Sequence, residues 1–99
     1  MKVRILDSAS QDLVDGFHFY EKQELGLGDY FIDSLFSDID SLQIYAGIHP
    51  TFFDKYYRML AKRFPFAVYY QIAEDEILVY AVLDCRRNPA WVRKKLEPS

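Results

Sequence analysis

The residues with the clearest chemical potential are arginines and lysines in the second half of the chain. Arg58 lies in a run of strand-forming residues and is followed by Lys62 and Arg63. Arg86 and Arg87 come directly after another such run. If the two runs flank a third strand in a meander, these side chains converge in a cationic cleft. Guanidinium groups bind phosphate through two hydrogen bonds, so such a cleft is typical of phosphodiester-cleaving proteins and of passive phosphate binders alike.

A structural interpretation of the same arginines also fits the sequence. Asp84 and Asp54 lie close to them in the chain and would form ion pairs on a solvated rim. Arginine also stays protonated, so it stabilises charge but does not serve as a general base. The arginines alone therefore do not establish catalysis.

Other catalytic groups are scattered. His18 falls within an expected helix, His49 in an expected loop before a proline, and neither is near the single cysteine, Cys85, in the sequence. One cysteine excludes a disulfide framework within the chain and a zinc site built from several cysteines. We therefore expect no nucleophilic triad, no metal and no cofactor.

Two further patterns have structural interpretations. Glu21 and Glu24 share one side of an expected helix, where exposed carboxylates usually serve only to solvate a face. The segment Gly26-Leu27-Gly28 follows no strand and lacks the full spacing of a dinucleotide-binding fingerprint. We interpret it as a turn.

Charge is divided unevenly between the two halves of the chain. The net charge of −3 combines an acidic half, residues 1–50, with three basic and nine acidic residues, and a basic half, residues 51–99, with nine basic and six acidic residues. An anionic partner would bind the second half, where five cations lie near the end: Arg86, Arg87, Arg93, Lys94 and Lys95.

Length and composition predict one cytoplasmic domain. The 99 residues, 51% hydrophobic and 27% charged, are typical of a compact soluble protein with a single core, which we place at 1–99. No apolar run approaches the roughly 18 residues of a membrane-spanning helix, and the N-terminus does not resemble a signal peptide. We expect no contact with membranes.

The first half predicts a strand followed by a helical hairpin. Residues 2–6 alternate as a strand does, and Ser8 with Gln11 forms a capping box that starts the first helix. Gly26-Leu27-Gly28 would end this helix, and Asp29 would cap the second. Apolar residues repeat on one face of each helix, and Asp33, Asp38 and Asp40 fall on the outside. The inward-facing residues are Ala9, Leu13, Phe17 and Tyr20, then Phe31, Ile32, Leu35, Phe36, Ile39 and Leu42.

The second half predicts three antiparallel strands. Gly47 and Pro50 end the second helix, and residues 56–62, 66–72 and 77–83 are rich in Tyr, Val and Ile with short connections. Asn88-Pro89 begins a short helix that extends to Leu96. The fold class is α+β, with an N-terminal strand and a helical hairpin packed on a mainly antiparallel sheet (β-α-α-β-β-β).

One face of this sheet lacks an obvious cover. Residues 77–83 are apolar at every position, which indicates a strand covered on both faces. The helical hairpin covers one face, and the terminal helix is too short to cover the other completely. A partner chain or a second copy would fill the remaining groove, whereas a closed internal core would leave no groove.

Several segments occur in a characteristic order and spacing. They are Ala9–Leu13, Leu25–Gly28 with Phe31, Tyr57–Leu60, Arg63–Tyr70, and Ala81–Trp91 with its strand, its arginine-bearing turn and its Pro-x-Trp. In these segments the chain resembles the RelE/ParE superfamily of toxins from bacterial toxin-antitoxin operons, often labelled plasmid stabilisation proteins. The resemblance covers nearly the whole chain. It implies a small cytoplasmic toxin that inhibits growth and is neutralised by a co-encoded antitoxin, which wraps around exposed apolar surface.

The superfamily contains two branches that this sequence matches unequally. One branch cleaves messenger RNA at the ribosome, and the ParE branch is associated with inhibition of DNA gyrase. Arg58 and either Arg86 or Arg87 match basic positions of the nuclease cleft, and they would be its catalytic residues. However, Leu60 and Ala67 stand where RNA-cleaving members tend to carry lysine and arginine. Trp91 or Val92 stands near the position of a tyrosine in those members.

The resemblance therefore favours a ParE-like toxin that acts by binding its target, with gyrase as the expected target. We expect the terminal helix to make this contact through Trp91, Arg93, Lys94 and Lys95. Two alternatives stay open: a ribosome-dependent endonuclease that uses Arg58, Arg86 and Arg87, and a degenerate relative that only binds its antitoxin. Whether the free protein forms a homodimer also stays open.

Overall fold

The most deeply buried element is the strand β4 (Phe66–Ala73), whose first five residues are all buried. In this computed structural model, which describes residues 1–97, β4 is the middle strand of a five-stranded sheet of order β1-β5-β4-β3-β2. Strand β1 is parallel to β5, and the other neighbours are antiparallel. The remaining strands are β1 (Lys2–Ile5), β2 (Thr51–Phe52), β3 (Tyr56–Leu60) and β5 (Glu76–Asp84).

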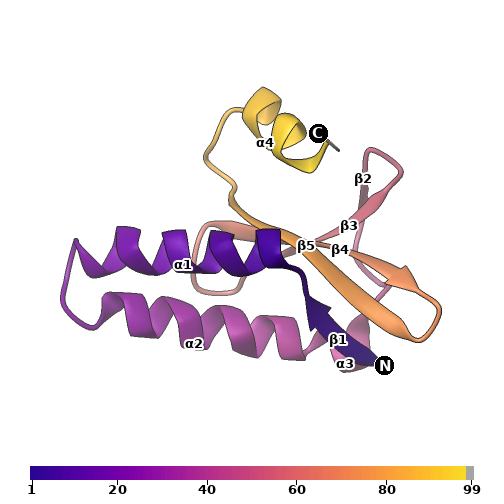
Figure 1. The fold of residues 1–99 in the computed structure, drawn as a ribbon, viewed down its shortest axis with the longest axis horizontal. Helices are drawn as coiled ribbons and strands as arrows, with labels where there is room; N and C mark the ends of the chain where they lie inside the picture. The colour runs from indigo at the N-terminus through magenta and orange to yellow at the C-terminus, as the bar shows by residue number, and fades with distance from the viewer. Residues whose placement is uncertain (98–99) are drawn as a thin grey trace.

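Helices lie on both faces of the sheet (Figure 1). The helices α1 (Asp7–Glu21) and α2 (Leu27–Asp40) run side by side as a hairpin, and α4 (Pro89–Leu96) lies apart from them at the other side of β5. A four-residue helix, α3 (Leu42–Tyr45), follows α2. None of the helices within residues 1–97 is both long and apolar enough to cross a membrane.

The alternation of side chains along β4 creates two separate cores. Val68 and Tyr70 point toward the α1–α2 hairpin and join the larger core. Ala67 and Tyr69 point to the opposite face and join the smaller core, which includes Val92 of α4. The expected α+β fold, with a hairpin on one face of a mainly antiparallel sheet, is confirmed.

Two glycines allow the hairpin to pack closely. A Cβ atom on Gly16 would lie 2.5 Å from Cζ of Phe31, and one on Gly28 would lie 2.8 Å from both Cδ1 and the backbone oxygen of Phe17. Both distances are too short for real atoms. The glycine inside α1 lowers its helix propensity by about 1 kcal/mol relative to alanine, and the buried Phe31 ring occupies the space that this glycine leaves.

The predicted capping box at the start of α1 is wrong. The helix begins at Asp7, and the Ser8 hydroxyl donates a hydrogen bond to the carbonyl of Tyr80 at 2.7 Å. Gln11 instead donates to the Asp15 carboxylate in the next turn. Ser8 is drawn to β5 because β1 ends at Ile5 and leaves the backbone of β5 open on that side.

The start of α2 also differs from the prediction. Gly26, with a φ of 92°, is the N-cap residue, so Asp29 lies inside the first turn and does not cap it. The cap comes from Glu21, whose carboxylate accepts hydrogen bonds from the N–H groups of Gly26 at 3.1 Å and Gly28 at 2.9 Å. Glu21 is therefore a structural group of the turn as well as an exposed carboxylate.

The second helix and the following strand end earlier than predicted. Helix α2 stops at Asp40, and α3 carries the buried Leu42. Asp38 was expected on the outside but is 3% exposed, and it accepts a hydrogen bond from the backbone N–H of Lys62. Strand β3 ends at Leu60, two residues before the predicted end at Lys62.

Candidate functional site

The face of the sheet opposite the hairpin carries Arg58 and the residues that pack against helix α4. On this face Arg58 pairs with Tyr69 across β3 and β4, and Leu60 pairs with Ala67. Helix α4 covers part of the face by burying Val92 and Leu96, in a core that also contains Tyr56, Ala67, Tyr69, Ala81 and Leu83. The Tyr56 hydroxyl donates a hydrogen bond to the Leu96 carbonyl at 3.0 Å.

Arg58 is the predicted site residue that lies on this face. Its Nε donates a hydrogen bond to the Tyr69 hydroxyl at 3.3 Å, and its Nη2 lies 3.7 Å from Cys85 Sγ. Burial lowers the pKa of Arg58, but the hydrogen bonds to Tyr69 and Cys85 outweigh burial and raise the pKa overall. The guanidinium is thus a permanent cation.

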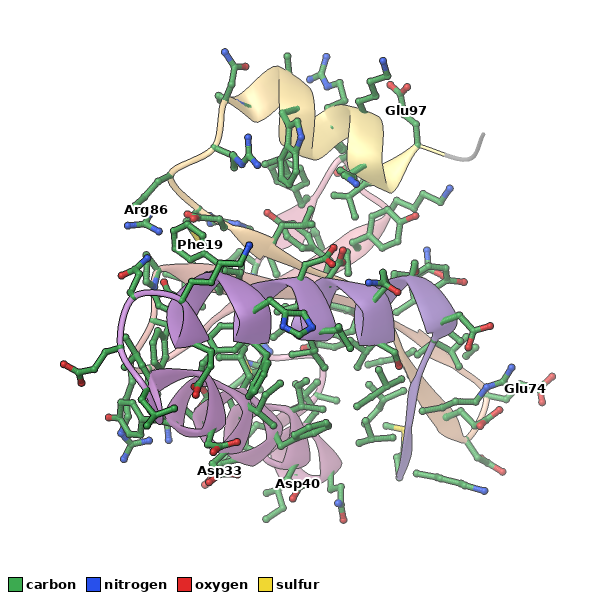
Figure 2. All side chains as sticks on the ribbon, turned by 60° about the vertical axis from the view of Figure 1, so that its left-hand side comes forward. Phe19, Asp33, Asp40, Glu74, Arg86 and Glu97 are labelled. Carbon is green, nitrogen blue, oxygen red and sulfur yellow. The ribbon has the colours of Figure 1, made fainter. Side chains whose placement is uncertain are left out.

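Arg86 is held by a carboxylate. Its Nε and Nη2 donate to the two oxygens of Asp84 at 3.0 and 2.8 Å, and its backbone N–H donates to the same carboxylate. These hydrogen bonds lower the pKa of Asp84. Of the two ion pairs that the structural interpretation offers, the one with Asp84 is present, whereas Asp54 pairs with no arginine among residues 1–97. Figure 2 shows Arg86 on the segment between β5 and α4.

The third predicted arginine has a different partner. Arg87 stacks on the Trp91 ring, with 4.4 Å between its Cζ and the ring centroid, and Lys95 lies 5.5 Å from the same ring. Arg58, Arg86 and Arg87 are therefore engaged by three different groups. Cation–π contact fixes the orientation of the Trp91 side chain.

The four predicted target-binding residues divide between two sides of α4. Trp91 and Lys95 line a cavity of about 340 Å³ between α4, β5 and α1, together with Asp12 and Phe19. Arg93 and Lys94 line a cavity of about 540 Å³ on the other side, between α4 and the turn after β2. Only Arg93 and Lys94 face away from the acidic hairpin.

The turn between β2 and β3 has a strained backbone, and it contacts Arg93 of α4. Phe53 and Asp54 both have left-handed backbones, with φ of 58° and 54°. Two consecutive left-handed residues form a tight hairpin turn in which Asn-Gly is the preferred sequence. A bulky residue in this conformation lowers stability by about 1–2 kcal/mol. The Phe53 ring lies 4.5 Å from the guanidinium carbon of Arg93. Phe53 was not predicted as a site residue, because nothing in its sequence neighbourhood indicates a left-handed turn.

Asp12 is a second group that the sequence did not single out. Its carboxylate accepts the backbone N–H of Val82 at 3.0 Å. Asp12 and Ser8 thus form hydrogen bonds with backbone groups of β5 that β1 does not reach. Burial raises the pKa of Asp12 to about 6, although the hydrogen bond from Val82 and the charge of Lys95 act in the opposite direction.

Asp12→Asn is expected to stabilise the protein at neutral pH. Because the pKa of Asp12 is higher in the folded state than its ordinary value of 3.8, the contribution of Asp12 to stability is greatest below pH 4 and is lost as the pH rises through 6. Asparagine retains the oxygen acceptor without the charge. The partly exposed site reduces the effect, so we expect a gain of about 1–2 kcal/mol at pH 7.5 and little change at pH 4.

Urea unfolding of both proteins at pH 4 and pH 7.5 measures this effect. Asp15→Asn is the matched control, because Asp15 lines the same cavity but is exposed. An equal gain in both variants, or a gain at pH 4, would contradict the assignment to Asp12.

His49 is a loop residue, as predicted, and it anchors its loop. Its Nδ1 is hydrogen-bonded to the hydroxyl of the buried Tyr70, which also accepts the N–H of Gly47 at 2.9 Å. Burial lowers the pKa of His49 and so favours the neutral ring. Neither His18 nor Cys85 is bonded to it among residues 1–97.

Comparison with known proteins gives one informative result. No protein-family model matches the chain, and no curated protein matches it significantly. A solved structure described as "Chromosomal ParDE TA system from P. aeruginosa" contains a chain that aligns with a TM-score of 0.71, covering 83% of this chain and 92% of that one at 17% identity. The chain has a ParE-like fold. The resemblance to the RelE/ParE superfamily is thus confirmed for the fold.

Arg58 and the basic helix α4 both belong to the second half of the chain. This half carries the excess of positive charge. Helix α1 of the acidic hairpin lines one cavity together with α4, whereas Figure 2 shows Asp33 and Asp40 pointing outward from α2.

Proposed function

We propose that this chain is the toxin of a type II toxin-antitoxin pair. It acts in the cytoplasm like ParE, binds DNA gyrase, inhibits growth and is neutralised by a co-encoded antitoxin. The observation that carries the proposal is the ParE-like fold, combined with apolar side chains at Leu60 and Ala67 beside Arg58. An RNA-cleaving member would carry further cations at those positions.

The chemistry of the face supports binding rather than bond cleavage. General acid-base cleavage of RNA requires groups that exchange protons near neutral pH. Arg58 remains charged, and the neighbouring Tyr69 hydroxyl and Cys85 thiol are hydrogen-bonded to it. Arg86 is already neutralised by Asp84. These residues hold charge but offer no proton relay.

We place the proposed target contact on the outer side of α4. Arg93 and Lys94 are exposed there, beside the Phe53 ring and away from the acidic hairpin. Two cations next to an apolar cavity suit an acidic protein surface with an apolar side chain at its centre. Trp91 and Lys95 would support this surface by holding α4 in position.

The order in which cellular processes fail tests the proposed function. We would induce the protein alone in bacteria and pulse-label DNA and protein synthesis separately over the first minutes. We expect DNA synthesis to fail first. Earlier failure of protein synthesis would support the endonuclease, and failure of neither would support a degenerate relative that only binds its antitoxin.

Purified gyrase provides a direct test of the contact. Arg93→Glu with Lys94→Glu is expected to raise the concentration needed to inhibit supercoiling at least tenfold, because two attractive charges become repulsive. Lys22→Glu is the matched control on the acidic hairpin. If wild-type protein in large excess leaves supercoiling unchanged, gyrase is not the target.

A second candidate function is the messenger RNA endonuclease. It is favoured by the position of Arg58, which is partly exposed on the face opposite the hairpin and near the arginine-bearing turn of Arg86 and Arg87. This function requires that purified protein cuts transcripts on active ribosomes and that Arg58→Ala or Arg86→Ala abolishes the cuts. Intact transcripts with active ribosomes would exclude it.

A further inference from the structure

The cavity between α1, β5 and α4 is lined by charges of both signs. Asp12 and Asp15 belong to α1, whereas Arg87 and Lys95 lie just before and on α4. The third carboxylate of the lining, that of Asp84, is already paired with an arginine. Two carboxylates therefore balance two cations in a volume of about 340 Å³. Sites for small molecules have volumes of about 300–1,000 Å³.

The opposite charges of this cavity do not meet. The two ion pairs found within residues 1–97 involve other side chains, so neither Asp12 nor Asp15 has a cationic group within 4 Å there. The charge of Lys95 nevertheless lowers the pKa of Asp12, so these two groups are near enough to interact. A cavity bounded by unpaired opposite charges favours a dipolar ligand with one charged group for each side.

Trp91 holds both cations on one side of the cavity. Its ring centroid lies 4.4 Å from Cζ of Arg87 and 5.5 Å from Nζ of Lys95. A cation–π contact uses the face of the ring and leaves the N–H groups of the cations available to a carboxylate. Phe19 and Phe66 add apolar surface to the same lining, and the Phe19 side chain is 50% exposed.

Asp12 is the group of the cavity that gains most from a cationic ligand. Its Oδ2 accepts the N–H of Val82 at 3.0 Å. Its Oδ1 accepts no hydrogen bond within residues 1–97 and is accessible, since no buried side-chain oxygen there lacks a partner. Burial raises the pKa of Asp12, because it disfavours the charged carboxylate. An ammonium group at Oδ1 would offset this penalty, and Asp15, one turn further along α1, offers a second carboxylate.

We propose that this cavity binds a small apolar zwitterion, namely a free α-amino acid with an aromatic or aliphatic side chain. Asp12 and Asp15 would accept hydrogen bonds from the ammonium group. Arg87 and Lys95 would donate to the carboxylate, and the apolar side chain would pack on Phe19. The ligand would thus connect α1 with α4, which no ion pair joins within residues 1–97.

Titration of the purified protein with L-phenylalanine and L-leucine tests the proposal. NMR is expected to show saturable shifts of the Gly16 and Val82 amides, which lie on two walls of the cavity, and the fluorescence of Trp91 should change with them. Two analogues are matched controls. L-Phenylalaninamide keeps only the ammonium charge, and N-acetyl-L-phenylalanine keeps only the carboxylate. Each should bind roughly tenfold more weakly than L-phenylalanine or worse, because one pair of charged side chains is left without a partner.

Variants at the two ends of the site separate the roles of the charges. Asp12→Asn should weaken binding of L-phenylalanine roughly tenfold and leave binding of the N-acetyl analogue unchanged. Lys95→Gln should weaken binding of L-phenylalanine and leave binding of the amide unchanged. Asp12→Asn is expected to stabilise the protein at neutral pH, so loss of binding in this variant does not reflect unfolding. Asp33→Asn on α2 and Lys94→Gln on the outer side of α4 are controls that should bind like the wild type.

The outcomes decide between a zwitterion site and simpler sites. If neither amino acid causes a saturable shift at Gly16 and Val82, the inference is overturned. Equal binding of L-phenylalanine and L-phenylalaninamide would indicate a site for organic cations, and equal binding of the N-acetyl analogue would indicate a site for anions. Either result also overturns it. None of these measurements involves gyrase, ribosomes or an antitoxin, so their failure leaves the proposed function unaffected.

Discussion

Phe31→Ala is expected to lower the free energy of unfolding by about 3–5 kcal/mol, the range for large aromatic truncations in a close-packed core. Phe31 is fully buried, and its ring centroid lies 5.2, 5.1 and 4.9 Å from those of Tyr20, Phe64 and Phe66. The ring joins the α1–α2 hairpin to the start of β4. A loss of this size is a large part of the stability of a small domain, about 5–15 kcal/mol.

Gly16 provides an independent check on the position of this ring. Gly16→Ala should destabilise the protein by about 1–3 kcal/mol, since the new methyl group overlaps Phe31. In a Phe31→Leu background the penalty should shrink, because leucine can move away from the methyl group. Val14→Ala, at an exposed position on the same helix, is the control. Urea unfolding of the four proteins measures the coupling, and strictly additive effects would show that the two residues do not touch.

The double variant Val92→Asp with Leu96→Asp is expected to detach α4 while the rest of the domain stays folded. The two side chains are the buried residues of α4, and burial of each contributes about 1.5–3 kcal/mol. Replacing both with carboxylates removes that contribution and adds a desolvation penalty. The proposed contact with gyrase should be lost with the helix.

Trp91 reports on this detachment because it is the only tryptophan in the chain. In the folded protein Arg87 and Lys95 both contact its ring, and detachment should shift its fluorescence to longer wavelengths. Ala90→Asp is the control, since Ala90 is exposed on the same helix. An unchanged spectrum, or global loss of circular dichroism, would contradict independent docking of α4.

The sequence best predicted those structural features that are formed by residues close together in the chain. The hairpin follows from apolar spacing in each helix, and the meander follows from runs of strand-forming residues with short connections. The start of α4 was also predictable, because Asn88 and Pro89 carry their own signal: the Asn88 side chain accepts the Ala90 N–H at 2.7 Å. The Arg86–Asp84 pair lies within one turn of the chain, so its residues could be paired by inspection.

Features that depend on distant segments could not be predicted. Strand β2 has two residues and exists because β3 lies beside it. Ser8 and Asp12 resemble ordinary helix residues, yet both bond to β5 because β1 ends beside it. Likewise, the contact between Phe53 and Arg93 requires a left-handed turn and a helix from the other end of the chain.

The parallel pairing of β1 with β5 has a consequence for how the protein is made. Lys2 lies opposite Glu76 and Ile5 opposite Val79, so the first strand has no partner until nearly the whole chain has been translated. At about 5–20 residues per second, β1 waits on the order of 4–15 s for β5. During that interval the hairpin can form, but the sheet that carries Arg58 and α4 is incomplete. Under the proposed function, an antitoxin present during this interval would meet a chain whose sheet is still incomplete.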